Sequence, residues 1–249
     1  MTTLNPETAI GSLQQLAPGL WSIHTDFCFE GTPHNIGNRT LVIPVKDLEV
    51  SEALNVTYIL TPGDFHYMRI KDWLPHFPSA KAYLPPGRIQ TKVAENPFPY
   101  ELLDAEVDNP LPELAPELVL QTVFGMKQMS HIPGHGTGIR IEYLFYHTGS
   151  KSVISGDSFW YAQDGFAVSA YYGPEKGGVG QIQNIGNVAG LKHTVARVLE
   201  WDFVNFISVH GGLTAFLTQD AKASFGRSVD FLANVPEDYK DEFEFVVKA

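Results

Sequence analysis

The stretch that decides the fold is His131-Ile-Pro-Gly-His135-Gly-Thr-Gly138, followed after an apolar run by Ser155-Gly-Asp157-Ser158. The Pro-Gly pair forms a tight turn that presents the imidazole of His135, and the two later glycines let the backbone pass close to whatever His135 touches. Asp157 follows a short predicted strand at 152–155 that ends at Gly156, so we expect it just past a strand end. Rigid strands supply position and loops supply ligands, so this pattern predicts a metal cavity at the edge of a β-sandwich.

The rest of the chain alternates short apolar strands with amphipathic helices. The strands end at turn-forming residues, and we expect them at 40–45, 56–61, 117–124, 139–146, 152–155 and 205–210. We expect helices at 66–76, 191–201 and 218–234, the last with Thr218 as N-cap. Sheets covered by helices are the predicted architecture, an α/β (α+β) protein.

Composition limits the class of protein. At 249 residues, 44% of them hydrophobic, the chain is predicted to form one domain, 1–249, with a sizeable core. The formal net charge of −11 disfavours nucleic acid and membrane surfaces as partners and leaves a small-molecule substrate. Residues 1–17 lack the pattern of a signal peptide, and no apolar stretch approaches the length of a membrane span, so we expect a cytoplasmic protein. With Cys28 as the single cysteine, a disulfide or a Cys-rich zinc site is excluded.

The order of motifs resembles the metallo-β-lactamase superfamily. Its Pro-Gly-His-Thr-x-Gly … Gly-Asp region is similar to residues 133–138 and 156–157, and there the histidine binds one metal and the aspartate bridges two. Further similarities follow in order, at residues 18–23, 56–61, 77–83 and 209–212, the last containing the late His-Gly at His210. The resemblance covers residues 17–234 and implies a four-layer αββα sandwich.

One loop departs from the family pattern. Where the family has Thr-His-x-His-x-Asp-His, this chain has Thr61-Pro-Gly-Asp-Phe-His-Tyr67. Aligned at Thr61, two ligand positions are lost, and Asp64 and His66 keep coordinating chemistry with their types exchanged. We take Asp64 and Tyr67 as candidate catalytic residues. Asp64 could instead be the N-cap of the next helix, and Tyr67 could donate a hydrogen bond in the pocket or merely fill it.

The resemblance leaves five candidate metal ligands: Asp64, His66, His135, Asp157 and His210. Three imidazoles and two carboxylates suit one ion, or two divalent ions about 3.5–4 Å apart bridged by Asp157 and a hydroxide. Zinc is the first expectation, with iron and manganese as alternatives, because all three accept nitrogen and oxygen ligands. His34 is a further candidate from a polar loop, whereas His24, His76, His147 and His193 are interpreted as surface or satisfied structural residues.

Three functions follow from this ligand set. A metal-dependent hydrolase would use a metal-bound hydroxide on an ester, lactone, thioester or amide. An iron-dependent oxidoreductase on the same fold is the second alternative, because His and Asp ligands without Cys also suit iron. A non-catalytic binding protein, whose altered loop no longer holds metal tightly, is the third. Fold alone does not choose among them.

Overall fold

The structure is a computed structural model that describes residues 13–17, 20–29, 32–42, 56–64, 66, 70–87, 90, 93–94, 97–128, 138–162, 165–168, 185–208, 216–218 and 220–248. Its strands are β1 (Leu13–Ala17), β2 (Leu20–Phe29), β3 (Thr32–Val42), β4 (Tyr58–Leu60), β5 (Lys81–Leu84), β6 (Glu101–Leu102), β7 (Leu118–Thr122), β8 (Tyr143–His147), β9 (Ser152–Ser155), β10 (Phe159–Ala162), β11 (Gly165–Val168), β12 (Asn205–Ser208) and β13 (Phe216–Thr218). Its helices are α1 (Ile70–Trp73), α4 (Val188–Glu200) and α5 (Ala221–Val229), with 3₁₀ turns η1 (Pro112–Leu114) and η4 (Asp230–Asn234).

The central sheet has the strand order β13-β12-β9-β8-β7. Strands β12 and β9 run parallel, and the other pairs run antiparallel. Successive residues of β8 point to opposite faces of the sheet. Leu144 and Tyr146 belong to the larger hydrophobic core cluster, and Tyr143 and Phe145 belong to the second cluster. Because side chains alternate across a strand, a strand with both faces buried is apolar on both, as β8 is from Tyr143 to Tyr146.

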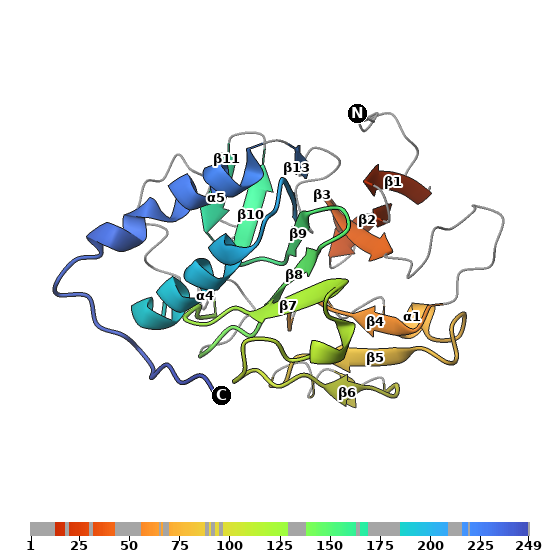
Figure 1. The fold of residues 1–249 in the computed structure, drawn as a ribbon. Coiled ribbons are helices and arrows are strands. Elements are labelled where there is room, and N and C mark those ends of the chain that lie inside the picture. The colour runs from red at the N-terminus through yellow and green to blue at the C-terminus, as the bar shows by residue number, and fades with distance from the viewer. Residues whose placement is uncertain are drawn as a thin grey trace.

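Helices and a second sheet cover the two faces of the central sheet (Figure 1). Helices α4 and α5 pack on one face, over the larger core cluster. On the other face lies the parallel sheet β4-β5-β6, whose outer side carries α1 and the small cluster of Ile70, Ala82, Leu84 and Val93. The layers are therefore helix, sheet, sheet, helix, which confirms the predicted αββα sandwich.

Helix α4 shows why the local sequence folds as it does. The Asn187 side chain accepts a hydrogen bond from Gly190 N and caps the first turn. The buried residues Leu191, Thr194, Val195 and Val198 recur at three- and four-residue spacing, which makes one continuous apolar stripe against the sheet. The observed bounds lie close to the predicted 191–201.

Several predicted elements differ in extent. Of the predicted helix at 66–76, α1 covers 70–73 and residues 74–76 form turns, while residues 67–69 lie outside the described residues. The predicted strand at 139–146 becomes regular only from Tyr143. Thr218 ends β13 instead of capping α5, whose N-cap is Asp220 in a left-handed conformation with φ 51°. His34 belongs to β3 and not to a loop. For the segment at 139–142 and for Thr218, other segments supply backbone partners that local sequence does not reveal: Arg140 N donates to Met126 O, and Thr218 pairs with Asn205 of β12.

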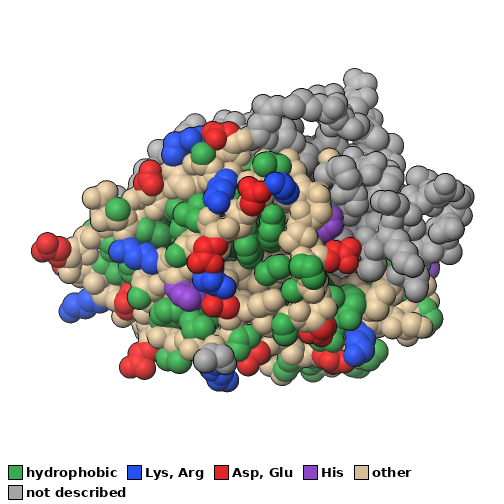
Figure 2. All heavy atoms as spheres, in the orientation of Figure 1, with side chains coloured by type: hydrophobic (Ala, Val, Ile, Leu, Met, Phe, Trp, Pro, Cys, Tyr) green, Lys and Arg blue, Asp and Glu red, His purple; other side chains and the backbone are tan. Residues whose placement is uncertain are grey.

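On the face shown in Figure 2, acidic and basic side chains alternate over the helices and loops, with apolar side chains between them. None of the helices within the described ranges is long and apolar enough to cross a membrane.

Candidate metal centre

Three side chains from separate segments meet at one end of the sandwich. His66 follows the loop after β4, Asp157 follows β9, and Glu142 directly precedes β8. The Nε2 atom of His66 lies 3.1 Å from Oδ1 of Asp157. One nitrogen or oxygen donor of each of the three residues lies within 4.8 Å of the other two, and both carboxylates are buried.

Glu142 holds the turn that carries Asp157. Its Oε1 accepts a hydrogen bond from Asp157 N at 2.9 Å, and its Oε2 accepts one from Ser158 N at 2.7 Å. The Ser158 hydroxyl donates a further hydrogen bond to Oε2. A carboxylate that accepts successive backbone N–H groups fixes the backbone there, so Glu142 sets the direction in which Asp157 points.

Two glycines make room for Glu142. A Cβ atom at Gly63 would lie 2.7 Å from Glu142 Cγ, and one at Gly156 would lie 2.9 Å from Glu142 Oε1. Both distances are shorter than non-bonded atoms tolerate, so any larger residue would displace the carboxylate. Gly63, at the variable position of the loop, and Gly156 therefore have a steric reason in this chain.

The electrostatics of the group favour a bound cation. Burial, and then the negative charge of Asp157, raise the pKa of Glu142 to about 7, while the charge of Arg140 acts in the opposite direction. Two buried carboxylates that face each other repel, and each lacks the hydration it would have in water. A divalent cation removes both penalties, and one imidazole with two carboxylates is a donor set that zinc, iron and manganese all accept. The residues present therefore fit a divalent metal ion.

Asp64 lies in the same loop but outside this group of three. It is 2% exposed, and its Oδ2 accepts a hydrogen bond from Gln128 Nε2 at 2.7 Å. Its backbone N donates to Ile141 O, which ties the loop to the segment that carries Glu142. Its predicted roles as ligand and catalytic residue stay predictions, and so does the alternative of an N-cap.

The other predicted site residues, His135, His210 and Tyr67, lie outside the described residues. Of the predicted ligands, the structure thus brings His66 and Asp157 together. It adds Glu142, which sequence reasoning missed. The signal was present in residues 139–146, where Arg140 and Glu142 are two charged residues within an otherwise apolar strand that follows the predicted ligand turn.

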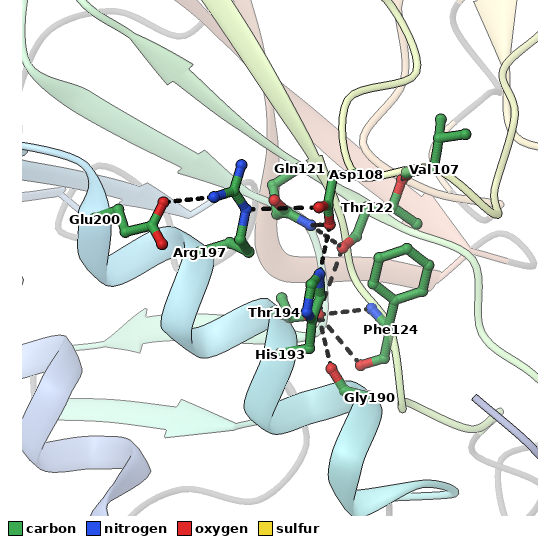
Figure 3. Close-up of polar contacts among 10 residues, drawn as sticks. All are labelled: Val107, Asp108, Gln121, Thr122, Phe124, Gly190, His193, Thr194, Arg197 and Glu200. Carbon is green, nitrogen blue, oxygen red and sulfur yellow. Dashed lines mark hydrogen bonds and ion pairs between the residues drawn. The ribbon is translucent and has the colours of Figure 1, made fainter. Parts of the chain in front are cut away.

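A second His–Asp pair lies on the side of the molecule where α4 covers β7. His193 Nε2 is 2.7 Å from Asp108 Oδ1, and Gln121 Nε2 donates to the same oxygen at 2.9 Å. Figure 3 shows His193 and Arg197 reaching from α4 toward Asp108, with Arg197 Nε 3.6 Å from its other oxygen. Phe124 packs edge-on against His193. This cluster, the Asp108 clasp, joins a loop to a helix and agrees with the structural interpretation of His193.

No protein-family model matches the sequence, and no curated protein matches it significantly. Solved structures do share its fold. A metallo-β-lactamase from Pontibacter korlensis matches with a TM-score of 0.51 and 9% identity, over 90% of this chain and 99% of that one. The metallo-β-lactamase FIM-1 from Pseudomonas aeruginosa, in its mono-zinc form, matches with a TM-score of 0.51 and 12% identity, over 94% and 100%. A metal-soaked Flv1 flavodiiron core from Synechocystis matches with a TM-score of 0.53 and 8% identity, over 89% of this chain and 60% of that one.

These matches and the layer order define a protein class: an αββα sandwich with a candidate metal centre at its sheet ends. The chain has the fold of the metallo-β-lactamase superfamily, as the sequence predicts, and at such low identity it is a divergent form of that fold.

Proposed function

We propose that this chain is a metal-dependent hydrolase that acts on an ester, lactone, thioester or amide. The observation that carries the proposal is the convergence of His66, Glu142 and Asp157, from three segments, on one buried point. Buried carboxylates that repel one another cost stability unless they serve a ligand, and a cluster of this kind on this fold is suited to holding a cation.

The residues divide the work in this proposal. His66 and Asp157 supply donor atoms, Nε2 and Oδ1, and the predicted ligands His135 and His210 complete the set. Glu142 offers a further carboxylate donor and orients Asp157 through the two backbone hydrogen bonds of its turn. Asp64, oriented by Gln128, takes up the proton that the attacking water releases. A bound divalent ion supplies a Lewis acid and lowers the pKa of water.

Metal content tests the site before any substrate is known. Protein purified without chelator is expected to carry stoichiometric zinc, iron or manganese by elemental analysis. A His66→Ala/Asp157→Ala double variant should lose that metal, whereas the matched pair His193→Ala/Asp108→Ala should keep it. If wild type binds no metal even after reloading, the hydrolase proposal is wrong and a non-catalytic binding protein becomes the better account.

Turnover tests the reaction class. Metal-loaded wild type should hydrolyse at least one member of a panel of esters, lactones, thioesters and amides, and the His66/Asp157 double variant should not. Equal rates for the two proteins across the whole panel would exclude hydrolysis at this site.

An iron-dependent oxidoreductase is the second candidate function. The match to a flavodiiron core is the observation in its favour, together with a donor set of imidazole and carboxylates that suits iron. Iron in the purified protein, with visible absorbance and no hydrolysis after zinc replacement, would favour it over the hydrolase.

A further inference from the structure

Arg140 is a buried cation without a hydrogen-bond or ion-pair partner among the residues that the structure describes. Its side chain is among the largest fully buried ones, at 1% exposure. Within the part of the chain that the structure describes, none of its three guanidinium nitrogens has a hydrogen-bond partner. A guanidinium stays protonated under all ordinary conditions and has five N–H donors, so burial without acceptors is costly. The partly exposed Arg197, by contrast, contacts both Asp108 and Glu200.

The strand geometry places Arg140 beside the candidate metal centre. Arg140 N donates to Met126 O and Gln128 N donates to Gly138 O, so the two segments pair antiparallel there. Residues 128 and 140 are then diagonal neighbours on one face of the pair, and Gln128 itself reaches Asp64. Glu142 is two residues further along the same extended segment, close enough to feel the charge of Arg140.

Structural ion pairing does not explain this arginine. The described residues include no carboxylate oxygen within 4.0 Å of its guanidinium nitrogens, although three buried carboxylates, Asp64, Glu142 and Asp157, lie in the same region. Gln128 Oε1, a buried acceptor on the same face, also has no partner within the described residues. A planar fork of donors with fixed charge is the group that recognises carboxylate and phosphate oxygens in pairs.

We propose that Arg140 binds an oxyanion group, a carboxylate or a phosphate, of the molecule that reacts at the metal centre. The proposal rests on the proposed function for the reaction and deepens it by naming the substrate class. The substrate is then an anion with its charged group at Arg140 and its scissile bond beside His66 and Asp157. Recognition by a desolvated guanidinium gives selectivity over neutral analogues on the order of 10- to 100-fold.

Three esters that differ in one distal group test the selectivity. They share the scissile bond and chain length and end in a carboxylate, a phosphate or a neutral carboxamide. Zinc-loaded wild type is expected to prefer one or both anionic esters in kcat/KM by about 10- to 100-fold, and the two anionic arms identify which oxyanion is recognised. Arg140→Gln should remove the preference, and the control Arg197→Gln should keep it. An Arg140→Gln enzyme with the wild-type preference, or a wild type with none, would overturn the proposal.

Equilibrium binding separates this proposal from the hydrolase itself. Succinate and inorganic phosphate are titrated into wild type and Arg140→Gln by calorimetry, at equal measured zinc content, so that binding to the ion contributes equally to both. At least one should bind about tenfold more weakly to the variant. Weaker binding in the variant without turnover of any ester would support oxyanion binding by Arg140 and contradict the hydrolase proposal. Turnover of an ester, with binding and selectivity unchanged in the variant, would support the hydrolase proposal and contradict oxyanion binding by Arg140.

Folding of the variants is a separate control. Arg140→Gln removes a cation whose charge lowers the pKa of Glu142, so its melting temperature is compared with that of wild type at equal zinc content before its binding is interpreted. Arg140→Lys keeps the charge but loses the fork, and should show intermediate binding. If Arg140→Gln does not fold, the Arg140→Lys comparison decides: full wild-type selectivity in that variant would contradict recognition by a paired-donor fork.

Discussion

The described part of the chain contains two His–Asp pairs with similar distances and different surroundings. His66 and Asp157 are 3.1 Å apart in the candidate metal centre, and His193 and Asp108 are 2.7 Å apart in the Asp108 clasp. At the clasp, Gln121, His193 and Arg197 all lower the pKa of Asp108 and outweigh its partial burial. At the metal centre, a second carboxylate, Glu142, is buried beside the pair, and its pKa is raised to about 7.

The residues that surround a His–Asp pair therefore indicate its role better than the distance between the His nitrogen and the Asp oxygen does. At the Asp108 clasp, a single carboxylate is contacted by an amide, an imidazole and the guanidinium of Arg197. The carboxylates at the metal centre face one another within a buried site, where an added cation is the natural counter-charge. Four predictions separate the two regions.

The largest expected effect is the loss of metal from Asp157→Asn. Replacement of one anionic oxygen donor by an amide should weaken zinc binding by more than about 100-fold, because even indirect partners of ligands are worth about 10- to 100-fold. Asp108→Asn should leave zinc affinity unchanged. Competition with a chromophoric chelator measures both. Equal affinities in the two variants would mean that the pairs are alike after all.

The two regions should depend on pH with opposite signs. Because the folded-state pKa of Glu142 is raised above its ordinary 4.5 to about 7, the metal-free folded state binds a proton more tightly than the unfolded state in that window. Metal-free protein should therefore lose stability as the pH rises from about 4.5 to 7, on the order of 2 kcal/mol. Denaturant unfolding of wild type and Glu142→Gln checks this, and a variant with the wild-type slope would contradict it.

Gly63→Ala should destabilise the loop at the metal centre. The added methyl group meets Glu142 Cγ, and overpacking of this kind costs about 1–3 kcal/mol. Gly226→Ala is the matched control, since the nearest contact of its Cβ is Leu199 Cδ2 at 3.9 Å and the residue lies within α5. The control should gain about 0.5–1 kcal/mol from helix propensity. Thermal melts of the two variants shifted in the same direction would count against this account.

The smallest effect is expected at the clasp. Asp108→Asn should cost about 1 kcal/mol at neutral pH, the worth of a part-exposed hydrogen-bonded ion pair. Its lowered pKa means that the stabilisation is present above the unfolded-state value and is lost as the pH falls through the folded-state value. On acidification the free energy of unfolding of wild type should fall by this amount, whereas that of Asp108→Asn should not show this fall. If the free energy of unfolding of the variant falls as much as that of wild type, Asp108 is not the group that titrates.

Sequence reasoning succeeded where signals are local. The apolar runs of β7, β8 and β9 and the three- to four-residue spacing of α4 predict their own structure, because burial repeats with the period of the element. The aspartate at a strand end and the altered loop can also be recognised in the sequence, and they place Asp157 and His66 among the candidate ligands. The predicted helix at 66–76 was too long, since its pattern of apolar residues fits one turn as well as three.

The sequence by itself determined the fold class, the order of the motifs and the lack of a Cys-rich zinc site, because these depend on residue types and on spacing along the chain. Only the tertiary structure decided that Glu142 joins His66 and Asp157, that Gly63 and Gly156 make room for it, and that Arg140 is buried without a partner among the described residues. These properties arise from segments 76 and 15 residues apart (142 − 66 and 157 − 142) that meet only when both sheets are packed. The charge state and role of a buried side chain depend on those distant neighbours, which the order of residues does not specify.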